Sequence, residues 1–174
     1  MTAYNILRDS EGFYYVFCKL EEIDTVPKFT PDSEKRRRDL EEYEKRHRQF
    51  PFLMSPMITN GALAVELAFK FLIFKENLEF ECDHKLDILF LQLPQKYGDE
   101  LRTKIYEQIH QNEESLMKNL NQISNLFVEA RYSFERDTIG YSNFFTDLVH
   151  LVCDYVIDMK KEYIYEEDDI LADD

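Results

Sequence analysis

Hydrophobic residues recur at intervals of three and four along the C-terminal part of the chain, which is the spacing of one face of an α-helix. The first series consists of Leu116, Leu120, Ile123, Phe127, Ala130 and Phe134. The second series consists of Phe145, Leu148, Val152, Tyr155 and Met159. The pattern therefore predicts two long amphipathic helices, each with one buried stripe.

The segment from Met57 to Lys75 is apolar on nearly every side. Its apolar residues are Ala62, Leu63, Ala64, Val65, Leu67, Phe69, Phe71, Leu72, Ile73 and Phe74. A helix that is hydrophobic all round has to be surrounded by other elements. We therefore expect this segment to form the central helix of the core, beginning after Pro51 and Pro56 interrupt the pattern.

Two shorter helices are predicted between the central helix and the long C-terminal ones. The first carries an apolar stripe and ends at Pro94; the stripe consists of Leu86, Leu89, Phe90 and Leu93. The second runs from about Gly98 to His110, with its stripe formed by Leu101, Ile105 and Ile109. Short connections between such helices favour antiparallel neighbours.

The N-terminal segment fits two patterns. A helical stripe would contain Phe13, Tyr14, Phe17 and Leu20. Strand alternation would instead contain Phe13, Tyr15 and Phe17, and aromatic residues are common in strands. We expect a helix here.

A further helix is predicted from Asp32 and Ser33, which can cap its start, to about Phe50. Acids and bases are interleaved along it, and its single apolar face is short, consisting of Leu40, Tyr43 and His47. Such a helix is expected to be solvated or to lie across a partner.

The composition favours helices over strands. The chain of 174 residues has only four glycines and five prolines, whereas an all-β protein of this size needs many more turns. We predict an all-α, antiparallel helical bundle that forms a single domain over residues 1–161. Residues 162–174 contain seven acids and no lysine or arginine, which predicts a solvated acidic C-terminal tail.

The formal net charge of −14 makes nucleic acid an unfavourable partner, because phosphate binding depends on lysine and arginine. A basic cluster at residues 35–38 has acids on both sides, which largely cancel its field.

Three cysteines lie far apart without a Cys-x-x-Cys pair, so neither a disulfide framework nor a metal site is predicted, and no cofactor is expected. Reduced thiols indicate the cytoplasm. The segment from Met57 to Phe74 contains Glu66 and Lys70, and we judge it too short and too charged to span a membrane.

Three short motifs carry a family resemblance. Glu66 and Lys70 form a Glu-x-x-x-Lys motif in the predicted central helix, residues 83–90 read Asp-His-Lys-Leu-x-x-Leu-Phe, and residues 131–135 read Arg-Tyr-Ser-Phe-Glu. In this order the motifs resemble the HEPN superfamily over residues 52–161. The resemblance implies a small helical bundle, a homodimer, and a role in stress or phage defence. Members of that superfamily include ribonuclease toxins, nucleotide-binding proteins and non-catalytic partners.

Catalytic members of that superfamily carry an arginine followed after four to six residues by a histidine, and this chain lacks the motif. No histidine follows Arg131 in that window, while Arg102 and His110 are separated by seven residues on a different predicted helix. Arginine alone can only stabilise phosphate charge. We therefore expect a non-catalytic interaction or regulatory domain. The alternatives are a divergent ribonuclease using Arg131 with Glu135 or with a histidine from elsewhere, and a nucleotide-binding module.

The candidate residues of a ligand site or polar network are Glu66, Lys70, His84, Arg131, Tyr132 and Glu135. Glu66 and Lys70 are one turn apart, which predicts an intrahelical pair, and their apolar helix demands polar partners. Arg131 and Glu135 have the same spacing and can serve as those partners across the bundle. A structural network is favoured over a ligand site. His84 is expected to cap the start of its helix, and no catalytic residue or metal ligand is assigned.

Overall fold

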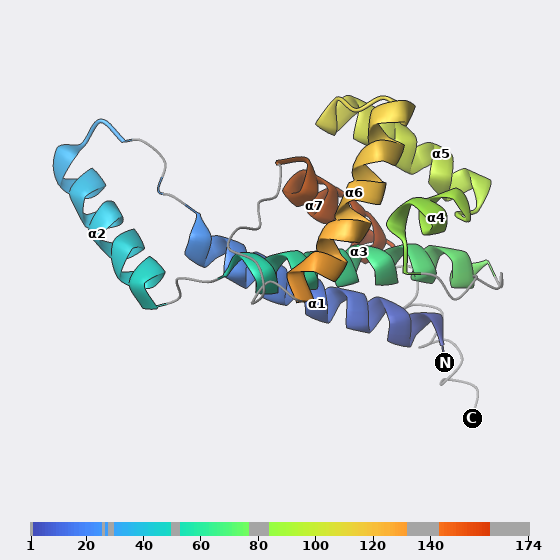
Figure 1. Ribbon diagram of the computed structural model, residues 1–174, viewed down its shortest axis with the longest axis horizontal. Helices are drawn as coiled ribbons and strands as arrows, with labels where there is room; N and C mark the ends of the chain where they lie inside the picture. The colour runs from blue at the N-terminus through green and yellow to red at the C-terminus, as the bar shows by residue number, and fades with distance from the viewer. Residues whose placement is uncertain are drawn as a thin grey trace, which may run out of the picture.

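The computed structural model describes residues 2–25, 27, 30–49, 53–76, 84–131 and 143–160, and for residues 126–131 it describes the backbone alone. Within these ranges the chain forms helices and no strand, so the predicted all-α bundle is confirmed (Figure 1). The α-helices are α1 (Ala3–Asp24), α2 (Ser33–Gln49), α3 (Met54–Lys75), α4 (Leu86–Leu91), α5 (Gln95–Lys104), α6 (Glu113–Arg131) and α7 (Asn143–Asp158). A π-helical turn, η1 (Ile105–Ile109), continues α5.

The N-terminal segment is the helix α1, as predicted. Thr2 caps its start, because its side-chain oxygen accepts the backbone N–H of Asn5 at 3.3 Å. Ile6, Leu7 and Phe17 are buried on one face of this helix. The aromatic residues that resembled a strand therefore follow a helical stripe, in which burial decides over intrinsic strand preference.

α3 lies at the centre of the fold, between α1 on one side and α4, α6 and α7 on the other (Figure 1). It runs antiparallel to α1, since Ser10 of α1 donates a hydrogen bond to the Ala64 carbonyl at 2.9 Å while Phe17 lies against Gly61. Gly61 also faces Phe145 of α7. A glycine at this position lets two large rings pack against the backbone of the central helix.

The start of α3 differs from the prediction. The helix begins at Met54, so Pro56 lies within its first turn instead of before it. A proline is tolerated there because the first backbone N–H groups of a helix have no intrahelical partner. The resulting 22-residue helix is the one described helix that is long and apolar enough to cross a membrane, contrary to our judgement of its length, although 67% of its most apolar window is buried inside the protein. Such burial is expected of the core helix of a soluble protein.

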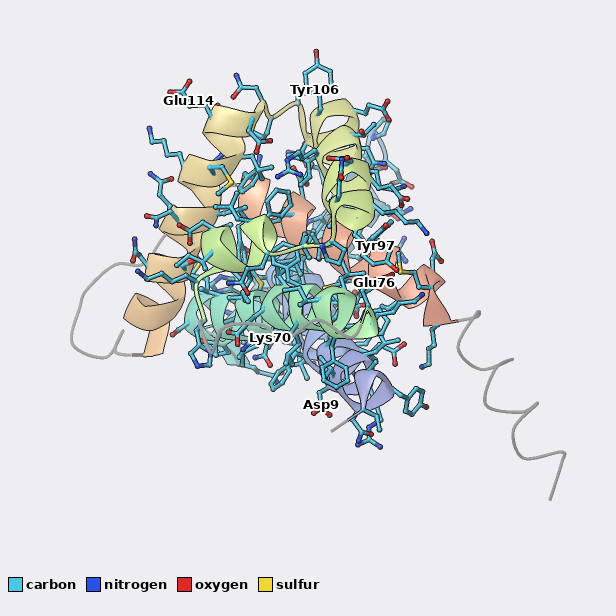
Figure 2. The ribbon with its side chains drawn as sticks, turned by 90° about the vertical axis from the view of Figure 1, so that its right-hand side faces the viewer. Asp9, Lys70, Glu76, Tyr97, Tyr106 and Glu114 are labelled. Carbon is cyan, nitrogen blue, oxygen red and sulfur yellow. The ribbon has the colours of Figure 1, made fainter. Side chains whose placement is uncertain are left out.

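α4 packs on α3, and α5 is joined to the residue that follows α3. Leu86, Leu89 and Phe90 of α4 are buried, as the stripe predicted. The phenol of Tyr97 in α5 donates a hydrogen bond of 2.7 Å to Glu76, the residue after α3, and the two side chains lie next to each other in Figure 2. These contacts fix the short helices to the end of the central one.

The predicted helix from Gly98 to His110 starts earlier and ends irregularly. α5 begins at Gln95 directly after Pro94, and its last turn widens into η1. His110 then stops the helix with a left-handed backbone, at φ 58°. Stripe residues spaced by four remain compatible with a π-helical turn, which is why the pattern did not reveal it.

The two long C-terminal helices are present. α6 contains Leu116, Leu120 and Ile123 of the predicted stripe as buried residues, while Phe134 lies outside the described residues. α7 buries a continuous face that includes Phe145, Leu148 and Val152. Burial of each such side chain contributes roughly 1.5–3 kcal/mol to folding.

α2 stands apart from the rest of the molecule in Figure 1 and has no buried residue. Asp32 caps it, because its carboxylate accepts the backbone N–H groups of Glu34 at 3.0 Å and Lys35 at 3.1 Å. Near the C-terminal end of α2, the Nε2 atom of His47 lies 3.7 Å from Oδ1 of Asp24 in α1. α2 is thus exposed in the single chain, and its lying across a partner stays a prediction; the helix ends at Gln49, one residue before the predicted end.

Candidate functional site

Glu66 and Lys70 form the predicted ion pair on α3. The Lys70 Nζ atom lies 2.7 Å from Glu66 Oε1, and the side chains are only 11% and 5% exposed. Removing two charges from water is costly, and the cost is offset only when both groups have good partners. Loss of one member of the pair should therefore lower the free energy of unfolding of the protein.

His84 is the second partner of Glu66. Its Nδ1 atom lies 2.8 Å from the same Glu66 oxygen, while its side chain is 73% exposed. An ionised carboxylate can only accept hydrogen bonds, so Nδ1 carries the proton of this contact. The buried carboxylate thus orients an exposed imidazole, an arrangement that can transfer a proton to or from a group that reaches the ring.

The expectation that His84 caps the next helix is wrong. Lys85 occupies the capping position of α4 and makes no side-chain cap bond. The Leu86 N–H instead donates to the side-chain oxygen of Ser124 in α6, at 2.8 Å. Ser124 in turn donates to the Leu120 carbonyl at 2.9 Å. The cap comes from a distant helix because the imidazole of His84 is already directed towards Glu66.

The other three predicted site residues, Arg131, Tyr132 and Glu135, take no part in the contacts of Glu66 described above. Arg131 is the last residue of α6, and its side chain lies outside the described part of the structure. Tyr132 and Glu135 also lie outside the described residues. The structure therefore brings together Glu66, Lys70 and His84, and the participation of the other three stays a prediction.

A second polar cluster, which the sequence did not reveal, joins α1 to α7. The Tyr14 phenol donates to Asp154 Oδ1 at 2.8 Å and lies 2.8 Å from Nδ1 of His150. The other ring nitrogen of His150 lies 2.8 Å from Glu21 Oε2. The four side chains form one unbroken row, from Glu21 through His150 and Tyr14 to Asp154. The spacing of seven residues between Tyr14 and Glu21, and of four between His150 and Asp154, puts each pair on one helix face and was the available signal.

Three ionisable groups in or near this cluster hold their protons. Burial, followed by the hydrogen bond to Asp154, raises the pKa of Tyr14 far above its ordinary value. Burial also raises the pKa of the Cys18 thiol and of the Cys153 thiol. A reactive cysteine needs the opposite shift. Neither thiol is therefore an activated nucleophile.

No group of three or more metal-ligating side chains occurs in the part of the chain that the structure describes. The hollows in that part are shallow and open to solvent. One has a volume of about 420 Å³ and lies along the start of α2; Thr30, Pro31, Ser33, Arg36, Arg37, Leu40, Glu41 and Glu44 line it. It is separate from Glu66 and His84, whereas Glu21 of the second cluster lines another open hollow, of about 230 Å³.

Comparisons with protein-family models, curated proteins and solved structures gave no significant match to the chain.

Proposed function

We propose that this protein is a non-catalytic interaction domain and that α2 is the element that contacts its partner. The observation that carries the proposal is the burial of the helices. α2 has no buried residue over its 17 residues, whereas α1, α3 and α7 each bury a face against the bundle.

A solvated helix of this length has little stability of its own. Its 17 residues are only slightly more than the roughly 12–15 below which isolated helices are marginal in water even with favourable sequences. The pair Arg37–Glu41, with a distance of 3.0 Å between highly exposed side chains, is of the kind that contributes only about 0.3–0.5 kcal/mol. A partner that packs along α2 would supply the stabilisation that the bundle does not.

The exposed side of α2 has features of a contact surface. Leu40 is 37% exposed, and the rings of Tyr43 and His47 pack edge to face at 5.5 Å on the same side of the helix. α2 also carries seven lysines and arginines against five acids, in a chain whose formal net charge is −14. An apolar stripe with a local basic excess favours a protein partner that offers an apolar and acidic face.

The test is retention of a partner by the intact protein. The tagged wild-type chain and its Leu40→Asp variant are purified from native cells, and retained proteins are identified by mass spectrometry. Leu91→Asp is the matched control, because Leu91 is even more exposed than Leu40 but lies on α4. Loss of one retained protein with Leu40→Asp and its retention with Leu91→Asp is expected. Equal retention by all three proteins would overturn the proposal.

A second copy of the chain is one candidate partner, as the HEPN resemblance implies. Sedimentation of the purified protein over a range of concentrations measures this directly. A dimer that dissociates in Leu40→Asp would identify the partner as the chain itself. The defence setting and the cytoplasmic location are part of the same proposal and rest on the resemblance and on the reduced cysteines.

A divergent ribonuclease is the second candidate function, and one observation favours it. His84, which comes from another element than Arg131, is oriented by Glu66 and exposes its ring. This is the kind of histidine that a divergent active site would need.

A further inference from the structure

The row Glu21–His150–Tyr14–Asp154 has a proton requirement that follows from its geometry. It contains three hydrogen bonds, and each needs one proton between its two heavy atoms. The carboxylates of Glu21 and Asp154 at the two ends can only accept when ionised. The phenol of Tyr14 supplies one proton, so the imidazole of His150 has to supply the other two.

The direction of each bond supports this assignment. Tyr14 donates its single proton to Asp154, at 2.8 Å. The raised pKa of Tyr14, caused by burial and by this bond, keeps the phenol protonated at neutral pH. The contact of 2.8 Å between Tyr14 and His150 Nδ1 therefore needs a proton on Nδ1. The contact of 2.8 Å between His150 Nε2 and Glu21 needs a proton on Nε2.

We propose that this row is a pH-sensitive latch between α1 and α7, which is complete only when His150 is an imidazolium. A neutral ring has one proton and can fill only one of its two contacts. The other contact then joins two lone pairs, which repel at hydrogen-bond distance. The latch therefore contributes its full stability when the ring carries both protons and loses part of it when rising pH removes one.

The charged groups around the row are mainly acidic, and Arg46 of α2 lines a hollow together with Glu21. From α1 the His150 ring contacts Glu21 and Tyr14, and the Cys18 thiol beside Tyr14 stays neutral because burial raises its pKa. From α7 it faces Asp154, and Asp147 lies one turn before it and lines a hollow together with Glu21. On the side of α3 the contacts are apolar, because Phe17 packs on His150 with ring centres 5.5 Å apart and Gly61 lies behind Phe17.

α2 adds one more pair near this end of α1. Asp24, one turn after Glu21, contacts His47 of α2 at 3.7 Å. This pair is more exposed and is separate from the row. The latch therefore joins two helices of the bundle close to the point where α2 leaves it, but the proposal does not depend on what α2 binds.

The test compares stability across pH. Urea unfolding followed by circular dichroism is measured from about pH 5.5 to about pH 8.5, the range in which histidines commonly titrate. The proteins are wild type, His150→Gln and the control His110→Asn, in which asparagine tolerates the left-handed backbone of residue 110. The difference in unfolding midpoint between wild type and His150→Gln should be largest at the acid end and shrink as pH rises. His110→Asn should follow wild type throughout.

Spectra of the intact protein with ¹⁵N-labelled histidine give the second readout. The chain has four histidines, and the signals missing in His150→Gln assign the ring in question. Both ring nitrogens of His150 should carry protons where the stability difference is largest. If His150→Gln does not fold, Tyr14→Phe replaces it, because removal of the phenol oxygen breaks the same row. A stability difference that is constant with pH, or a singly protonated ring at the acid end, would overturn the latch.

Discussion

Ser124 of α6 caps the start of α4 through its contact with Leu86. The backbone N–H of Leu86 donates to Ser124 Oγ at 2.8 Å, and both residues are buried. Helices commonly receive this bond from the residue that precedes them, whereas here it comes from a helix 38 residues further along the chain. The bond joins helix formation in α4 to its docking on α6.

Replacement of Ser124 by alanine should destabilise the protein by about 1–3 kcal/mol, because it leaves a buried N–H without an acceptor. Urea unfolding measures the loss. The matched control is Ser33→Ala, at an exposed serine in the first turn of α2, which should change stability by no more than about 0.5 kcal/mol. Equal effects at the two positions would show that the Ser124 bond contributes little.

The helices could be predicted because their apolar stripes are local in sequence. Leu120 and Ile123, for example, lie one turn apart and are buried together. The Glu66–Lys70 pair was predictable for the same reason, since both residues lie on one helix. In each case a single period of 3.6 residues carries the information.

Contacts between distant segments could not be predicted in this way. The bond from His84 to Glu66 spans 18 residues, and the bond from Tyr14 to Asp154 spans 140. Which faces of two helices meet depends on the packing of the whole core. The sequence pattern of a single helix carries no information about its partner face. The same reason explains why His84 was assigned to the nearest helix end.

Gly61 and Gly12 provide a matched pair of glycine-to-alanine substitutions within helices. A Cβ atom at Gly61 would lie 2.7 Å from the Phe145 ring and 2.9 Å from the Phe17 ring, both of which are buried. Gly61→Ala should therefore cost about 1–3 kcal/mol through overpacking. At Gly12 no atom lies within 4 Å of the added Cβ, so Gly12→Ala should stabilise α1 by up to about 1 kcal/mol. Thermal unfolding of both variants tests the sign, and stabilisation by Gly61→Ala would show that the rings can move apart.

The purified protein should not cleave RNA. The arginine-histidine motif of the catalytic HEPN proteins is missing, and the formal net charge of −14 repels the substrate. Total RNA and tRNA are incubated with the protein at low salt and analysed on denaturing gels. His84→Ala and Arg131→Ala are tested beside wild type. Cleavage by wild type that disappears in either variant would establish the ribonuclease alternative and would place that residue in its active site.

The buried pair Glu66–Lys70 should show strong coupling in a double-mutant cycle. Glu66→Gln or Lys70→Met removes one member of a buried ion pair, at a cost of about 3–5 kcal/mol. The double variant removes both charges, so its loss should be clearly smaller than the sum of the two single losses. Because Glu66 also holds His84, Glu66→Gln should cost more than Lys70→Met.

The control for this cycle is Arg37 with Glu41 on α2. The pair has the same spacing of four residues, but its side chains are 70% and 62% exposed. Solvent screens such pairs, so Arg37→Met, Glu41→Gln and the double variant should each change stability by less than about 1 kcal/mol and should be additive. Urea unfolding of all six variants compares the two cycles. Additive, small effects at Glu66 and Lys70 would mean that water reaches this pair, and the cluster with His84 would then have to be treated as an exposed binding surface.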